Sequence, residues 1–599
     1  MAWTFLTLAV APALALILLA ATFGSAAGQQ SEADLDTRRL HALFEEEWEW
    51  RMRDSPTLAT YVGDPRYDDR WQDLSWEAVE ARRAHARELL ERISAIDRAS
   101  LPESERLNYD LFLHDAREAV EGQRFPRELL TLNQLDGVYS EPAQMAQVMP
   151  RATVADYENL LRRLERVPEL VDQHVRLLER GVDARVTPPR IVLRDVGQLV
   201  QNQIVDDPRR HPVYRIAFEE MPPSIPDLER ERLRKAARRV LAQRVVPAYR
   251  RLHEFVTERY LPAARESIAA VDLPDGEAWY AFEVRRRTTT DLTPGEIHEI
   301  GLREVARIRG EMERVKTETG FEGDLPAFFE FLRTDPRFFH RDEEALLAEY
   351  RDIAKRVDPA LPRLFGTLPR LPYGVVPVPE YSERTQTTAY YYPGSPQAGR
   401  PGLFYANTYD LPSRPKWEME ALTLHEAVPG HHLQIALAQE LPDVPLFRRW
   451  LSDATAFVEG WGLYAESLGP ELGMYGDPYA RFGQLTYEMW RAIRLVVDTG
   501  MHAKGWSRER AIEYFLANAG KAEHDVVVEI DRYIAWPGQA LAYKIGELRM
   551  KELRARAETE LGERFDVRAF HDTLLGAGAL PLFVLEARIE DWIARQASG

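Results

Sequence analysis

Residues 425–434 read HEAVPGHHLQ, and the fold and chemistry of the chain can be approached from this stretch. A His-Glu pair with further histidines close behind is typical of a zinc-binding helix. Two histidines four residues apart share one face of a regular helix and can therefore bind one zinc ion. Here His425 and His431 are separated by six positions, which places them on different faces of a regular helix.

Pro429 and Gly430 offer a way around this spacing. Pro429 lies four residues after His425, so it has no N–H for the carbonyl of His425 and it interrupts the helix. Gly430 then permits unusual backbone angles. We predict a bulge or kink that takes up the two extra residues and brings His431 to the metal, with His432 as the alternative ligand.

Acidic residues complete the predicted site. Glu426, beside the first ligand, is expected to act as the general base toward a metal-activated water. The segment 453–469, DATAFVEGWGLYAESLG, places Glu459 among apolar residues, where an unpaired carboxylate is costly. Glu459 is therefore the predicted third ligand. Glu466, seven residues along the same face, is the alternative ligand or a group that orients the ligands.

A helix break with surface histidines is the competing interpretation of residues 425–434. Three of the 14 histidines of the chain fall within this stretch, and apolar residues flank it on both sides. Buried imidazoles in such surroundings need polar partners, which favours a metal site.

Composition limits the partners and the metal ligands. The chain has 599 residues, a net charge of −19 and no basic run with interleaved aromatic residues, so we expect no nucleic-acid partner. It contains no cysteine, which excludes disulfides and thiolate ligands. A metal ion must therefore be held by histidine and carboxylate groups.

The N-terminal residues 1–28 are apolar and end in small residues before a charged stretch. This pattern is typical of a secretory signal, although no basic residue precedes it and its length also suits a membrane anchor. We expect an exported protein, periplasmic or secreted, with a membrane anchor as the alternative to cleavage.

The rest of the chain reads as mainly helical. Residues 32–290 are expected to form an N-terminal helical lobe, as in YENLLRRLERVPELVDQHVRLLERG at 157–181. Residues 291–599 form the predicted catalytic lobe, beginning with a helix capped by Thr293 and Glu296. Within it, TQTTAYYYPGS and GLFYANTYDLP predict a small sheet just before the histidine-rich stretch.

Three segments carry a family resemblance: HEAVPGHHLQ, VEGWGLYAE at 458–466, and DRYIAWPGQALAYKIGE at 531–547. Together they resemble the family called domain of unknown function 885 (DUF885), usually placed beside the gluzincin metallopeptidases. The resemblance implies a mainly α, two-lobed metallopeptidase-like fold with a deep cleft, similar to angiotensin-converting enzyme, thimet oligopeptidase and carboxypeptidase Taq. Mapped onto this chain, it implies zinc on His425, His431 and Glu459.

The spacing of the histidines departs from that pattern. Those relatives keep H-E-x-x-H, whereas dipeptidyl peptidase III resembles a halfway case with one extra residue. The departure leaves His431 and His432 as alternative ligands.

Related peptidases also use a Tyr or His from a C-terminal helix to stabilise the oxyanion. Tyr543 is the predicted donor, and Tyr533 and His524 are the alternatives. In gluzincins an edge strand binds the substrate backbone, so Tyr405 and Asn407 are expected to contact peptide.

A row of polar residues on one helical stripe, Arg494, Asp498 and His502, has two interpretations. It either orients the metal ligands or forms a structural salt-bridge row.

These features predict a zinc-dependent peptidase of short peptides outside the cytoplasm. A zinc hydrolase of a non-peptide amide or ester is the alternative enzyme, because the same ligands and base serve it. The third candidate is a non-catalytic binding protein on the same fold.

Overall fold

A computed structural model of the chain describes residues 32–598, apart from 380–382, 384–386, 397–398 and 451–453. The predicted leader, residues 1–28, lies outside this part of the chain. Among the helices of the described residues, none has the length and apolar character needed to cross a membrane.

The protein is mainly helical, as predicted. In the first half the helices are α2 (Glu32–Asp54), α3 (Pro56–Val62), α4 (Trp76–Ser94), α5 (Glu103–Gly122), α6 (Glu141–Val148), α7 (Val154–Glu165), α8 (Val167–Ala184), α9 (Arg190–Leu193), α10 (Val196–Gln201), α11 (Pro212–Tyr214), α12 (Asp227–Val240), α13 (Val246–Phe255), α14 (Leu261–Ala263) and α15 (Gly276–Thr288). In the second half they are α16 (Pro294–Glu318), α17 (Leu325–Thr334), α18 (Glu343–Val357), α19 (Leu361–Leu364), α20 (Met419–Glu426), α21 (His431–Gln439), α22 (Leu446–Trp450), α23 (Thr455–Ser467), α24 (Pro478–Ala503), α25 (Arg508–Asn518), α26 (Glu523–Ala535), α27 (Ala542–Leu561), α28 (Val567–Leu575) and α29 (Leu582–Ser598).

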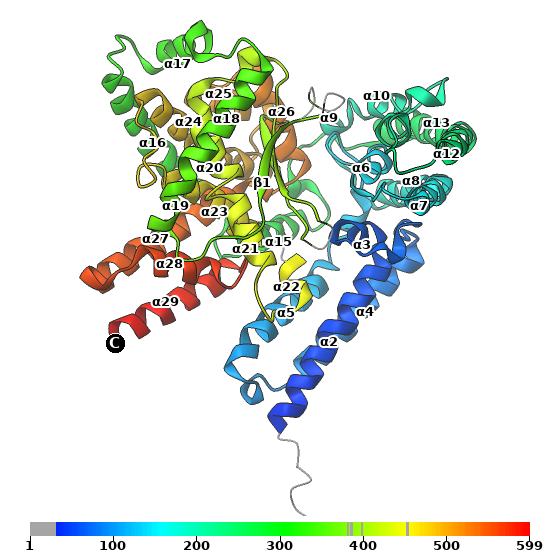
Figure 1. The fold of residues 1–599 in the computed structure, drawn as a ribbon, viewed down its shortest axis with the longest axis horizontal. Helices are drawn as coiled ribbons and strands as arrows, with labels where there is room; N and C mark the ends of the chain where they lie inside the picture. The colour runs from blue at the N-terminus through cyan, green and yellow to red at the C-terminus, as the bar shows by residue number, and fades with distance from the viewer. Residues whose placement is uncertain (1–31, 380–382, 384–386, 397–398, 451–453, 599) are drawn as a thin grey trace, which may run out of the picture.

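Local sequence signals set the helix boundaries. The predicted capping box is present at the start of α16, where Thr293 and Glu296 bond each other's backbone N–H groups. Helices α6, α7, α8, α10, α12 and α13 enclose an apolar core of their own, built from residues such as Leu160, Val171 and Leu241. Figure 1 shows these helices gathered on one side, with α16 to α29 on the other.

A small mixed sheet lies beside the histidine-bearing helices. Among the described residues it contains β1 (Tyr373–Pro377), β2 (Ala389–Tyr392) and β3 (Gly402–Ala406), in the order β1-β3-β2. Strand β3 runs parallel to β1 and antiparallel to β2. The two predicted strand segments are thus confirmed as β2 and β3. The expected edge position of GLFYANTYDLP is wrong, because β3 is paired on both sides.

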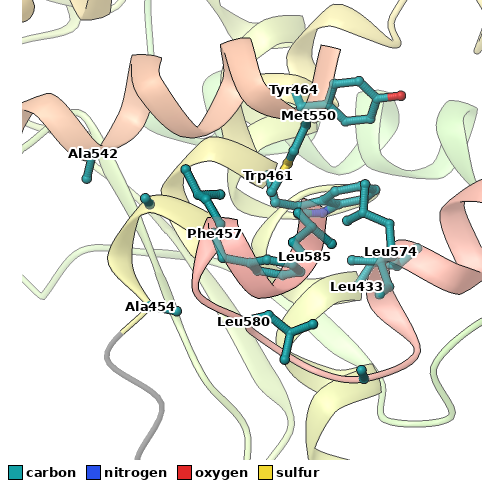
Figure 2. Packing of buried hydrophobic residues seen from close by; sticks show 14 of the residues in the cluster. Leu433, Ala454, Phe457, Trp461, Tyr464, Ala542, Met550, Leu574, Leu580 and Leu585 are labelled. Carbon is teal, nitrogen blue, oxygen red and sulfur yellow. The ribbon is translucent and has the colours of Figure 1, made fainter. Parts of the chain in front are cut away.

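The helices that carry the predicted site pack on one apolar core. Phe457 and Trp461 of α23 contribute fully buried rings, and Figure 2 shows them surrounded by residues of α21, α27, α28 and α29. Helices α23 and α27 touch through glycines. A β-carbon on Gly460 would lie 2.5 Å from Cα of Gly546, so neither position accepts a side chain without separating the helices.

Candidate metal centre

The histidine-rich stretch is an interruption between two helices. Helix α20 ends at Glu426 and α21 begins at His431, so the predicted kink is a full break. A β-carbon on Gly430 would lie 1.9 Å from the carbonyl oxygen of His425, which requires glycine at this turn. The indole N–H of Trp461 donates to the carbonyl of Pro429 at 2.8 Å and holds the connection against α23.

The break brings two imidazoles and one carboxylate together. Oε2 of Glu459 lies 3.7 Å from Nε2 of His425 and 3.5 Å from Nε2 of His431. One ligand-type atom from each of the three residues falls within 4.8 Å of the others. Two histidine nitrogens and a carboxylate oxygen form a donor set that zinc uses in hydrolases, with a further position left open. The three predicted ligands therefore form a single cluster.

The electrostatics of this cluster favour a cation. Burial lowers the pKa of His425, but hydrogen bonding to Glu459 and Glu466 outweighs it and raises the pKa to about 9. Burial likewise raises the pKa of Glu459, and its bonds to His425 and His431 reverse this and hold it well below the usual range. The carboxylates thus stabilise positive charge between the imidazoles.

Glu466 orients the first imidazole. Its Oε1 lies 2.8 Å from Nδ1 of His425, and its side chain is fully buried. A carboxylate on the far nitrogen of a metal-ligating histidine fixes the ring and its tautomer. Gly462 allows the ring to approach α23, because a β-carbon there would lie 2.7 Å from Cε1 of His425. Of the two roles predicted for Glu466, this contact is the orienting one.

His432 lies away from the cluster, with both ring nitrogens engaged. Its Nδ1 is 2.9 Å from the hydroxyl of Tyr391, and its Nε2 is 3.0 Å from the carbonyl of Leu371. Burial lowers the pKa of His432 to about 4, so the ring is neutral at pH 7. His432 therefore links α21 to the sheet, and His431 is the histidine that faces Glu459.

Glu426 is buried at the end of α20, next to His425. Within the described part of the chain, no hydrogen bond or ion pair engages its carboxylate.

The structure separates the three candidates for oxyanion stabilisation. Tyr543 lies in the first turn of α27. Burial raises the pKa of its phenol, and the charge of Glu459 raises it further, so Tyr543 lies within electrostatic reach of the metal cluster. Tyr533 is buried, and its hydroxyl is bonded to Trp490, Arg494 and Glu529. His524 is exposed at the start of α26. Of the two tyrosines, Tyr543 is the one whose pKa responds to the charge of Glu459.

The row of Arg494, Asp498 and His502 contacts segments that are distant in the sequence. Arg494, Asp498 and His502 bind neighbouring segments instead of one another or the metal ligands. Asp498 accepts hydrogen bonds from the hydroxyl of Tyr280 and the N–H of Gly538, and His502 faces the carbonyl of Tyr533 at 2.9 Å. Arg494 forms a buried ion pair with Glu529, so the salt bridge of this row runs to another helix and not along the row.

In the sheet, Tyr405 stacks on Tyr390 at 4.9 Å, and the amide of Asn407 donates to the carbonyls of Glu383 and Thr387. Both residues thus make contacts within the sheet and with the loop beside it. The edge next to the metal helices belongs to β2, which contacts α20.

Sequence reasoning missed the groups that hold the ligands in place. Trp461 and Gly462 stand inside VEGWGLYAE, and the alternation of glycine with bulky residues was the available signal for a close helix contact. Arg532 lies in the segment DRYIAWPGQALAYKIGE but was not among the predicted site residues.

Comparison with known proteins gives a family and a fold. A family model described as "Bacterial protein of unknown function (DUF885)" matches residues 56–589. A crystal structure described as a candidate lipoprotein from Colwellia psychrerythraea is 28% identical, with a TM-score of 0.89, covering 94% of this chain and 100% of that one. A candidate lipoprotein of unknown function from Shewanella oneidensis is 16% identical with a TM-score of 0.65, covering 92% and 99%, and shows the fold alone. No curated protein matches the sequence significantly.

Proposed function

The chain belongs to the DUF885 family, and on that premise we propose that it is a zinc-dependent metallopeptidase of short peptides. One observation carries the proposal. Ligand atoms of His425, His431 and Glu459 converge within 4.8 Å, and Glu426 follows the first of these residues at the end of α20.

The donor set fits zinc. His425, His431 and Glu459 would hold the ion, and Glu466 would orient the first of these ligands. When bound, zinc supplies Lewis-acid polarisation and makes water a nucleophile near neutral pH. The carboxylates of Glu459 and Glu466 support this fit, because they place negative charge beside the imidazoles that would bind the cation.

The protein's own groups supply the proton transfers and the charge stabilisation. Glu426 removes the proton of the attacking water and delivers it to the leaving amine. Tyr543 donates its phenolic hydrogen to the oxygen on which negative charge develops. Since burial raises the pKa of this phenol, Tyr543 remains a neutral donor at pH 7.

The location and shape of the enzyme belong to the same proposal. The resemblance to gluzincins supports a two-lobed body with a deep substrate cleft. Backbone pairing of the substrate is assigned to β2, the strand that contacts α20, instead of β3. The candidate lipoproteins among the similar structures support export, in line with the leader at residues 1–28.

The substitution Glu426→Gln tests the proposal. It keeps the shape of the side chain and removes the proton acceptor, so the variant should bind zinc normally and cleave peptides at least about a hundredfold more slowly. The same exchange at Glu420, which lies on α20 but contacts Arg356 and the backbone of Tyr475, is the matched control.

Zinc content by elemental analysis and turnover of a peptide library by mass spectrometry are the two measurements. Near-parental cleavage by zinc-loaded Glu426→Gln would refute the mechanism. Parental protein that is inert toward every peptide would favour the amide or ester hydrolase, or the binding protein.

A further inference from the structure

Two arginine side chains beside the metal centre share a single carboxylate. Arg494 of α24 and Arg532 of α26 lie 3.2 Å and 3.1 Å from Oε2 of Glu529. The hydroxyl of Tyr533 donates to the same oxygen at 2.6 Å. The exposed fractions of the Arg494, Arg532 and Glu529 side chains are only 6%, 13% and 9%. Two buried positive charges are thus opposed by one negative charge.

Neighbouring acidic residues do not supply the missing negative charge. Asp531 is already paired with Arg194 and Arg508. Asp498, one turn along α24 from Arg494, is fully buried, and burial raises its pKa to about 7 despite the hydrogen bond from Tyr280. A carboxyl group that is partly protonated at neutral pH is a poor counterion for a guanidinium.

The arginine pair, Arg494 and Arg532, adjoins the metal centre through Tyr543. The guanidinium carbon of Arg494 lies 4.4 Å from the centre of the Tyr543 ring. Arg532 donates to the side-chain carbonyl of Gln539 at 2.8 Å, in the turn that leads into α27. Helices α23 and α27 touch at Gly460 and Gly546. Glu459 is the neighbour of Gly460, and Tyr543 lies one turn before Gly546. The metal ligand and the phenol therefore flank the same helix contact.

We infer that the arginine pair receives a carboxylate of the substrate, so that the enzyme acts next to a free C-terminus. This inference rests on the proposed peptidase function. A guanidinium binds a carboxylate through two parallel N–H hydrogen bonds. A buried positive charge without a full counterion is costly, and a bound anion lowers that cost. Every unblocked peptide carries such a carboxylate at its C-terminus. An Asp or Glu side chain near the cleaved bond is the other source of the same chemistry.

Three forms of one peptide distinguish these sources: the free acid, the C-terminal amide, and an amide that ends in Glu. We expect the acid to be cleaved with a kcat/KM about 10 to 100 times that of the amide, the range given by one charged hydrogen-bonded contact. The Glu-ended amide should be as poor as the plain amide. A Glu-ended amide that matches the acid would overturn the assignment to the C-terminus.

Arg532→Gln identifies the residue responsible. In this variant the acid-to-amide ratio of kcat/KM should fall to near one, because the acid loses a contact that the amide never makes. Arg508→Gln is the matched control, since Arg508 contacts α26 through Asp531 and lies outside the arginine pair. It should keep the parental ratio. A parental ratio in Arg532→Gln would refute the role given to the pair.

A binding measurement separates this inference from the peptidase proposal. Zinc-loaded Glu426→Gln should bind the acid more tightly than the amide in calorimetry, and Arg532→Gln added to it should abolish the difference. Retained preference for the acid without any cleavage by the parental protein would overturn the peptidase proposal alone. Equal binding of acid and amide, or binding of neither, would overturn the carboxylate inference.

Discussion

The most direct test of the metal centre is the addition of one carbon atom, in Gly462→Ala. A β-carbon at this position would lie 2.7 Å from Cε1 and 2.9 Å from Nε2 of His425, whereas ordinary contacts begin at 3.4 Å. The imidazole must therefore retreat by about 1 Å. It is buried and bonded to Glu466 through Nδ1, so it cannot move without losing that bond.

The size of the effect follows from the tolerance of a metal site. Zinc–ligand distances hold within about 0.2 Å, so a displacement of about 1 Å removes His425 from the ligand set or strains it. We expect zinc affinity to fall by at least about 10 to 100-fold, the range found when a ligand loses its orienting partner. Crowding at this position destabilises the fold by about 1 to 3 kcal/mol. Alanine stabilises a helix by about 1 kcal/mol relative to glycine, which offsets part of that loss. The variant should therefore remain folded.

Chelator competition gives the zinc affinity, and thermal unfolding of the metal-free protein reports the fold. Gly310→Ala is the matched control, because Gly310 lies inside α16 and a β-carbon there meets no atom within 4 Å. It should gain about 0.5 to 1 kcal/mol of stability and keep parental zinc affinity. Parental zinc affinity in Gly462→Ala would refute the assignment of His425 as a ligand.

Three further outcomes are expected. His431→Ala should lose zinc while His432→Ala retains it, as measured by elemental analysis, because both nitrogens of His432 are bonded elsewhere; the reverse would transfer the ligand role. Tyr543→Phe should slow peptide cleavage by about 10² to 10³ at unchanged zinc content, whereas unchanged kcat would exclude Tyr543 as the oxyanion donor. Asp498 has a folded pKa of about 7 against an ordinary 3.8, so its contribution to stability is complete below pH 3.8 and is lost as the pH rises through 7. The free energy of unfolding of Asp498→Asn should therefore exceed that of the parent by on the order of 4 kcal/mol at pH 8 and equal it near pH 4. Thermal unfolding measured across this pH range tests the prediction, and parallel pH profiles for the two proteins would contradict it.

Much of the local structure could be predicted because it depends on short-range signals. The capping box at Thr293 and Glu296, the break at Pro429 and the strands at β2 and β3 all follow from residues within a few positions of one another. The three predicted ligands also cluster, since the chemistry of buried imidazoles and carboxylates restricts where such side chains can go.

Long-range relations could not be predicted in the same way. The order β1-β3-β2 depends on which strands pair with each other. Alternation of apolar residues identifies the buried face of a strand but not the strand that lies beside it. The stripe of Arg494, Asp498 and His502 was visible, but its partners Tyr533, Gly538 and Tyr280 come from distant segments. Periodicity identifies the buried face of a helix and does not identify what covers it.

The glycine contact between α23 and α27 has a consequence for motion. At Gly460 and Gly546 the backbones of α23 and α27 are in direct contact, so the helices cannot slide past one another at this point without a backbone clash. Thermal fluctuations should then carry Glu459 and Tyr543 as one rigid body. The separation between the metal ligand and the phenol is in that case fixed during folding, before any substrate arrives, and the substrate must adapt to it.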